Sequence, residues 1–255
     1  MSLNVDPFWL LAFLLAFVRA GAWLVVVPPF ANRAVIPPMA SVGVAGGLAL
    51  LAAPRLASSA LPTSTAGLVG AIATQVATGV ALGLSVKVLL AAVTAAGSLV
   101  DLFGGLNLPT AIDPLSENQT PIFGQFYEQV AMVLLFITNG EMLLVRGFVA
   151  SFHAPGLTLS SSGQLAGILT SDLATFFTAA LEIAAPIIVV LYTAQIGLAL
   201  VSRAAPQVNV WVLGMPVQAL LSILFVAIGI KVIPGSVGRL LERAAEDMTQ
   251  LISRR

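Results

Sequence analysis

Residues 201–218 read VSRAAPQVNVWVLGMPVQ, a stretch that places an arginine, two glutamines, an asparagine and two prolines between two long apolar runs. An ordinary membrane span would end there in a solvated loop, and an ordinary soluble core could not hold the flanking runs. Polar, proline-bounded backbone in so apolar a chain is tolerated where other protein shelters it. The stretch therefore predicts bent backbone, enclosed by protein, between membrane helices.

The composition of the 255 residues is that of an integral membrane protein. Hydrophobic residues make up 58% and charged residues 9%, with a mean hydropathy of +1.02, whereas a soluble domain has about 25% charged residues. The formal net charge is zero, and without a basic run we expect no nucleic-acid partner. With no cysteine and one histidine, neither a disulfide nor a Cys- or His-based metal centre is expected.

Catalytic motifs are missing from the sequence. No nucleophile elbow, phosphate loop or paired-carboxylate site is apparent. We therefore expect no enzyme and no cofactor.

Six apolar runs meet or approach the roughly 20 residues that cross a bilayer as a helix: 8–27, 40–60, 66–100, 124–151, 173–201 and 210–233. The third is too long for one perpendicular span, so it should tilt, kink or comprise two helices. Pro186 and Pro216 should kink the fifth and sixth. The predicted fold is all-α, a polytopic helical membrane protein with kinked and broken helices, in a single domain over 1–255.

Small and polar residues inside the runs suggest how the helices pack. Glycines four apart, at Gly43/Gly47 and Gly79/Gly83, allow close backbone approach, although such spacings are common in membrane helices. Intramembrane charge costs roughly 2.5–3.5 kcal/mol and needs a partner, and Arg19 could pair with Glu141 or Glu182. Such charges could form a proton relay, but structural pairing is the simpler reading. A polar patch could line a water path or bond across helices: Thr74, Gln75 and Thr78.

The C-terminal residues, 235–255, follow a helical pattern. Apolar residues recur at three- and four-residue steps and predict an amphipathic helix, which would lie on the membrane surface or against a partner. With six spans, one side of the membrane carries most of the loop arginines: Arg55, Arg239, Arg243, Arg254 and Arg255, against Arg33 and Arg203 on the other. The C-terminus is therefore predicted to be cytoplasmic.

Three short motifs occur in a fixed order along the chain. Ala96-Gly97 is followed by Ile112-Asp113-Pro114; residues 136–140 are followed by Ser151-Phe152-His153; and SRAAPQVNVW, residues 202–211, is followed by Gly214-Met215-Pro216. Together they resemble the family of the flagellar biosynthesis protein FliR and the T subunit of the type III secretion export apparatus. The last motif is the most specific, because it resembles the family's R-x-x-P-Q-x-N-(aromatic)…G-x-P turn.

The resemblance implies a core subunit of the flagellar type III export gate in the bacterial inner membrane, at the flagellar basal body. Family members join FliP and FliQ in a helical assembly through which unfolded proteins pass. FlhB wraps around this assembly, and FlhA is an expected neighbour. The family pattern also implies a FliP-like part over about 1–170, a FliQ-like hairpin over about 171–234 and the cytoplasmic tail, 235–255.

The same resemblance assigns two sites. A plug loop that closes the channel would comprise Gly105, Leu106, Asn107, Leu108, Pro109, Ile112, Asp113 and Pro114. A turn that contacts partners during assembly would comprise Arg203, Pro206, Gln207, Asn209, Gly214 and Pro216. Composition alone favours a plain surface connector for residues 101–121, which are rich in glycine and proline.

Other functions remain open at this stage. The nearest alternative is the corresponding export-gate subunit of an injectisome. A small-solute secondary transporter would predict inverted repeats around discontinuous helices, yet the two halves of this chain share no motif. A purely structural assembly scaffold is a third reading, which differs mainly in whether the plug loop matters.

Overall fold

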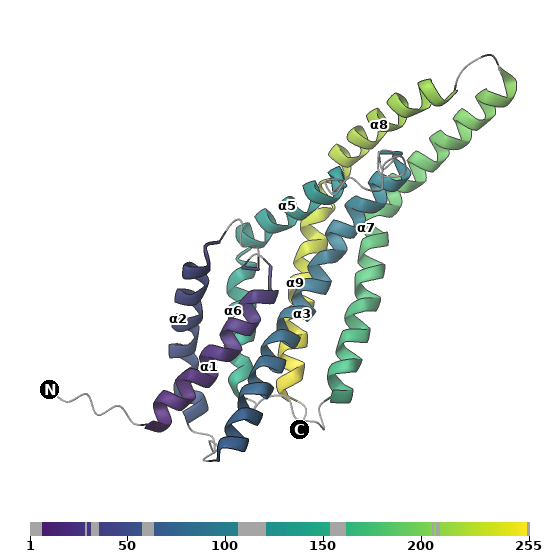
Figure 1. Cartoon of the computed structure of the whole chain (residues 1–255). Coiled ribbons are helices and arrows are strands. Elements are labelled where there is room, and N and C mark those ends of the chain that lie inside the picture. Colours follow the sequence, from purple (N-terminus) through teal and green to yellow (C-terminus); the bar gives the residue numbers. More distant parts are fainter. Residues whose placement is uncertain are drawn as a thin grey trace. The chain divides into compact units, whose positions relative to one another are not determined.

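The computed structural model describes residues 7–28, 30–31, 36–57, 64–106, 121–153, 162–205, 207 and 210–253, and the predicted all-α class is confirmed over them. Figure 1 shows the helices. In chain order they are α1 (Pro7–Val26), α2 (Pro38–Ala57), α3 (Thr65–Phe103), α5 (Ile122–Ile137), α6 (Gly140–Ala150), the 3₁₀ turn η1 (Ser151–His153), α7 (Ser162–Ala204), α8 (Val210–Gly229) and α9 (Ile233–Ser253).

Four of these helices, α1, α2, α3 and α7, are long and apolar enough to cross a membrane. The number rises to six if α5 with α6, and α8 with α9, each count as one broken span. The long third run forms a single helix of 39 residues, about 58 Å at 1.5 Å per residue. Pro186 and Pro216 lie inside α7 and α8, each of which continues past its proline.

The fourth apolar run does not form the one continuous helix that we predicted. α5 ends at Ile137 and α6 begins at Gly140, because Asn139 between them adopts a left-handed conformation with φ of 53°. Asparagine tolerates this conformation better than most residues, because its short polar side chain bonds locally. A single left-handed residue is enough to break the helix without lowering the hydrophobicity of the run.

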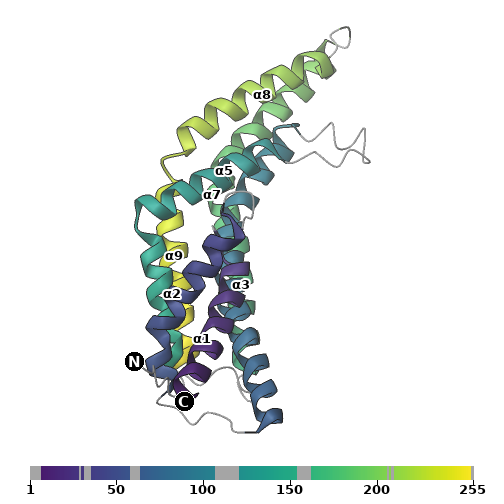
Figure 2. The same cartoon turned by 60° about the vertical axis from the view of Figure 1, so that its left-hand side comes forward.

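The helices divide between two compact units, and α3, α7 and α9 contribute to both. The first unit comprises Met1–Leu89, Asn139–Leu173 and Leu240–Arg255; the second comprises Leu90–Thr138 and Ala174–Arg239. In the first unit, α1 and α2 lie side by side in both views (Figures 1 and 2). In the second, α8 runs back along the end of α7, with Gly214 beside Leu198 (Figures 1 and 2).

In the first unit, glycines bring α3 into close contact with α1. A Cβ added at Gly79 would lie 2.5 Å from the Arg19 carbonyl oxygen, and one at Gly83 would lie 2.8 Å from Val26 Cβ. The predicted small-residue seam is therefore present at this pair. Gly43 and Gly47 face no described atom within 4 Å, so their spacing serves no close contact within the described chain.

Arg19, fully buried in α1, joins three parts of the first unit. Its Nε donates to Gln75 Oε1 of α3 at 2.6 Å, and its Nη1 donates to the Ser151 carbonyl oxygen at 2.8 Å. The guanidinium lies over the Phe152 ring, 4.3 Å from its centroid. The predicted pairing of Arg19 with Glu141 or Glu182 is wrong, since these neutral groups are its partners and Glu182 pairs with Arg239 at 3.4 Å. In the polar patch, Gln75 thus bonds across helices.

The amphipathic C-terminal helix is confirmed as α9. Its described apolar positions are buried: Val237, Leu240, Leu241, Ala244 and Met248. In the first unit, Met248 packs against Gly147 of α6, where an added Cβ would lie 2.7 Å from the Met248 sulfur. The tail therefore packs against the chain's own helices.

Candidate functional site

The C-terminus of α3 forms the start of the predicted plug loop, in the second unit. Gly105 has φ of +69°, a conformation that glycine adopts without a Cβ penalty. The Leu106 N–H donates to the Asp101 carbonyl at 3.1 Å, and the Gly105 N–H donates to the Leu102 carbonyl at 3.4 Å. This pair of bonds is the Schellman motif, which satisfies the last carbonyls of a helix. The helix thus ends at a defined point just before residue 107.

Asp101 joins this end of the loop to the other. Its carboxylate is fully buried, and Oδ2 accepts the backbone N–H groups of Phe123 at 2.9 Å and Gly124 at 3.0 Å. These belong to the first turn of α5, whose N–H groups have no partner within the helix. A carboxylate there is also favoured by the helix dipole. Asp101 therefore caps α5 from α3 and holds the two ends of the loop together.

Close backbone packing reinforces this stem. A Cβ added at Gly97 of α3 would meet the Phe123 carbonyl oxygen, with the carbonyl carbon at 2.6 Å and Gly124 N at 2.8 Å. Gly124 in turn faces Ser98, with an added Cβ 2.7 Å from the serine Oγ. Glycine is needed at 97 because the α5 backbone occupies the space that a side chain would fill.

Side chains of α7 and α8 also reach the stem. Gln195 of α7 donates from Nε2 to the Phe103 carbonyl at 2.8 Å, which satisfies one of the last carbonyls of α3. On α8, Gln218 Oε1 would lie 2.8 Å from a Cβ on Gly105, and Ser222 Oγ 2.5 Å from one on Gly104. Four helices of the second unit, α3, α5, α7 and α8, therefore converge on the described residues at the base of the loop.

Comparison with known proteins identifies the kind of molecule that carries this stem. The family described as Bacterial export proteins, family 1, matches residues 10–244. The chain belongs to this family. The resemblance inferred from the three motifs is thereby confirmed.

The relatives of this export protein include flagellar and secretion proteins. It is 27% identical to the flagellar biosynthetic protein FliR of Bacillus subtilis, over 95% of each chain. It is 29% identical to FliR of Escherichia coli, over 86% of this chain and 84% of the relative. It is 25% identical to the Yop proteins translocation protein T of Yersinia pestis, over 86% and 85%.

The two predicted sites of this export protein are only partly described by the structure. Of the plug residues, Gly105 and Leu106 lie in the turn that caps α3, and six lie outside the described residues: Asn107, Leu108, Pro109, Ile112, Asp113 and Pro114. Of the turn residues, Pro206 and Asn209 also lie outside. Gln218 of α8, two residues after Pro216 and outside the predicted turn, adjoins Gly105 of the predicted plug loop.

The described turn residues differ in their surroundings. Arg203 is exposed in the last turn of α7, and Gln207 and Pro216 are exposed as well. Gly214 is buried, and a Cβ there would lie 3.4 Å from Leu198, an ordinary contact distance. Within this chain, Gly214 thus serves the α7–α8 hairpin, while Arg203 and Gln207 are available to another surface.

The capping role of Asp101 is a feature that motif reasoning missed in this export protein. The signal was present, since an acidic residue near the C-terminus of a long apolar helix opposes the helix dipole and needs a compensating contact. The Gly104-Gly105 pair that follows marks the helix end. The sequence does not indicate which helix Asp101 caps, because α5 follows only after a long connecting segment.

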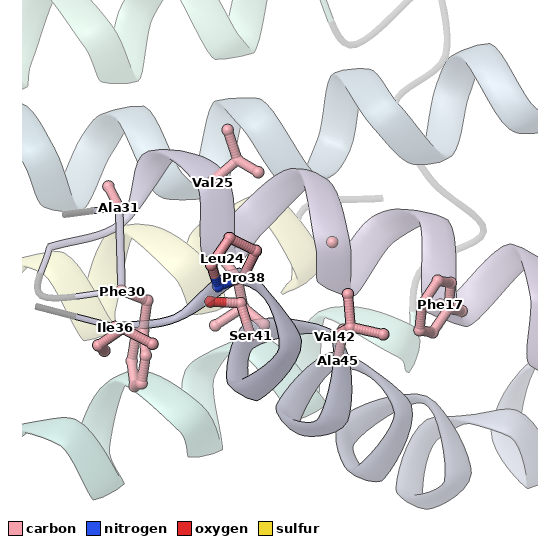
Figure 3. Close-up of a pocket in the computed structure, with 11 residues that line it drawn as sticks. Phe17, Leu24, Val25, Phe30, Ala31, Ile36, Pro38, Ser41, Val42 and Ala45 are labelled. Atoms are coloured by element: carbon pink, nitrogen blue, oxygen red, sulfur yellow. The ribbon is translucent and has the colours of Figure 1, made fainter. Parts of the chain in front are cut away.

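A cavity in the first unit was examined as a second candidate site. It has a volume of about 360 Å³ and lies between α1, α2 and the residues that connect them (Figure 3). Ser41 supplies the one hydroxyl among its lining side chains; the others are apolar or glycine, as Figure 3 shows for those it labels. Among the described residues, the cavity lining includes no titratable group, and there is no cluster of three metal-ligating side chains in the described part of the chain.

Proposed function

We propose that this chain is a core subunit of the flagellar type III protein export gate. In this proposal it forms, with FliP and FliQ, the channel through which unfolded flagellar proteins leave the cell. The observation that carries the proposal is the family match over residues 10–244, which spans the whole helical body. It acts by shape and position, without catalysis, cofactor or nucleic acid.

The loop after α3 serves as the plug of the closed gate. Support comes from its stem, where Asp101 joins α3 to α5 and Gln195 fixes the end of α3. A plug must return to one place after each opening, and a stem held by buried hydrogen bonds gives it a fixed origin. The exposed Arg203 and Gln207 at the α7–α8 turn contact neighbouring subunits.

The protein resides in the bacterial inner membrane at the flagellar basal body, with α9 and the C-terminus on the cytoplasmic side. The excess of arginines on that side supports this orientation. FlhB and FlhA are its further partners. The part up to about residue 170 is arranged like FliP, and residues 171–234 form a hairpin like FliQ.

A flagellar role is favoured over an injectisome role. FliR proteins of two organisms are 27% and 29% identical to this chain, over 86% to 95% of it. The secretion proteins match less well: SsaT of Salmonella typhimurium is 27% identical over 61% of the chain, and the Yop proteins translocation protein T of Yersinia pestis is 25% identical over 86%. The genes that neighbour the coding sequence distinguish the two roles directly.

The function is tested by tagging the full chain in its own host, purifying it in mild detergent and identifying the proteins that accompany it. We expect FliP and FliQ in fixed proportion, and a deletion strain that regains motility when the gene is restored. A chain that purifies alone from a fully motile deletion strain would contradict the proposal.

Arg203→Ala is expected to reduce the amount of FliQ that co-purifies by roughly tenfold, the equivalent of about 1.4 kcal/mol. The side chain is exposed in the last turn of α7, and an arginine fork at an interface commonly contributes more than 1 kcal/mol. Lys231→Ala removes another exposed cation of the second unit and serves as the control. Equal FliQ recovery with both variants would show that Arg203 contacts no partner.

A further inference from the structure

Two carboxylates that lie far apart in the sequence meet in the interior of the first unit. Asp172 on α7 and Asp247 on α9 are 0% and 1% exposed, and their carboxyl groups lie within hydrogen-bonding reach of each other. The export function proposed above does not use this pair.

The surroundings of the pair supply fewer donors than two carboxylates need. Ser85 of α3 donates from Oγ to Asp172 Oδ2 at 2.5 Å. Arg243 lies with its Nε 3.4 Å from Asp247 Oδ2, while its Nη2 donates to Ser171 Oγ at 2.7 Å. Asp172 Oδ1 and Asp247 Oδ2 accept no hydrogen bond. A proton bound to either acid would give it an O–H that can donate to the other.

The charges around the pair also favour a protonated form of one of the two acids. Arg243 is the one cation that acts on Asp247, while Asp172 and Glu246 add negative charge. Of the other elements packed here, α3 carries Lys87 and α6 carries Arg146, and both of these are exposed. One half-exposed guanidinium balances one carboxylate, and two adjacent carboxylates share a site at low cost only if one is protonated.

We propose that Asp172 and Asp247 form a proton-binding site, in which one proton shared by the two carboxyls fastens α9 to α7. The protonated acid donates to the other, while Ser85 holds Asp172 Oδ2 and the Arg243 guanidinium lies beside Asp247 Oδ2. A metal ion is a poorer occupant, because two carboxylates and a hydroxyl beside a guanidinium offer few ligands and a repelling charge.

The sign of the pH dependence follows from linkage. Burial, with Asp172 close by, raises the pKa of the Asp247 carboxyl to about 7, above that of a carboxyl in the unfolded chain, so its proton adds stability at low pH. That contribution is lost as the pH rises to the point at which the pair releases its proton. Above it, two adjacent buried negative charges push α9 away from α7.

The docking of α9 can be measured by disulfide cross-linking, because the chain has no cysteine of its own. A Cβ at Gly147 would lie 3.3 Å from Met248 Cβ, close to the 3.5–4.5 Å of disulfides. Gly147→Cys with Met248→Cys also removes the methionine sulfur that would crowd the new side chain. The two cysteines are oxidised in the full chain, in native membranes that have been made permeable to protons. The reaction is repeated at pH values from about 5.5 to about 8.5.

Asp247→Asn and Asp172→Asn in this cysteine background are the informative variants, since an amide N–H replaces the shared proton at every pH. Dividing the cross-linked fraction by that of the Asn variant cancels the effect of pH on thiol oxidation. We expect this ratio to fall roughly twofold or more as the pH rises. Glu242→Gln, which removes an exposed carboxylate of α9, should behave as the parent.

Three results would overturn the proposal. The first is a ratio that stays constant over the pH range. The second is cross-linking at high pH that sodium or magnesium ions restore, which would assign a cation to the site. The third is failure of both Asn variants to accumulate while the Glu242→Gln variant does, because an amide should substitute for the proton.

Discussion

Gly97→Ala is expected to lower the free energy of unfolding by about 2 kcal/mol. Alanine is the better helix former by about 1 kcal/mol, so propensity alone predicts a gain. Against it stands the new Cβ, which would meet the Phe123 carbonyl and lie 2.8 Å from Gly124 N. These are backbone atoms that cannot rotate away, and overpacking of this kind costs up to about 3 kcal/mol. The clash therefore outweighs the gain.

The same change should also loosen the stem of the loop. Shifting α5 to relieve the clash moves the N–H groups of Phe123 and Gly124 away from the Asp101 carboxylate. The measurement is thermal unfolding in detergent, with Gly70→Ala as the matched control. Gly70 lies in the same helix and faces no described atom within 4 Å, so its replacement should be neutral or stabilising. Equal stability of the two variants would refute the packing of α5 on α3.

Arg19→Ala is expected to destabilise the protein by about 2–5 kcal/mol, because each buried acceptor left without its donor costs about 1–3 kcal/mol. The change leaves Gln75 Oε1 and the Ser151 carbonyl buried without the donor they now have. It also leaves a void beside the Phe152 ring. Denaturant unfolding of the purified chain measures the loss.

Two further variants divide this loss into its causes. Arg19→Met restores most of the volume without the donors, so it should recover only the packing part. Arg146→Ala removes an exposed cation of the same unit and should change stability by less than about 0.5 kcal/mol. Wild-type stability of the Arg19→Met variant would show that the hydrogen bonds of Arg19 contribute nothing.

Much of the helical framework could be predicted, because hydrophobic length and periodicity are local properties of the sequence. The first two spans and the amphipathic tail follow from them directly. The break at Asn139 did not, since one left-handed residue leaves the apolar run unchanged. The long third run was expected to tilt, kink or comprise two helices, and of these the division into two helices does not occur, because α3 is one helix of 39 residues.

The polar contacts were the part that sequence could not supply. Arg19 bonds to neutral groups on two other elements, whereas charge counting favoured an acidic partner. The contacts of Asp101, and those between Asp172 and Asp247, depend on which helices become neighbours. No local sequence pattern predicts those neighbours. The family motifs did point to the loop and the turn, and Gly105 of the loop adjoins Gln218, two residues after the turn, in the described chain.

Passive ion leakage through the assembled gate tests the account most directly. Leakage is measured for gates assembled with the intact chain and for gates assembled with a chain that lacks residues 107–114. The deletion keeps Gly105 and Leu106, which cap α3. Membranes without the chain give the background. If the loop closes the channel, leakage rises well above that of the intact gate while FliP and FliQ still assemble. An assembled gate that leaks no more without these residues would contradict the account.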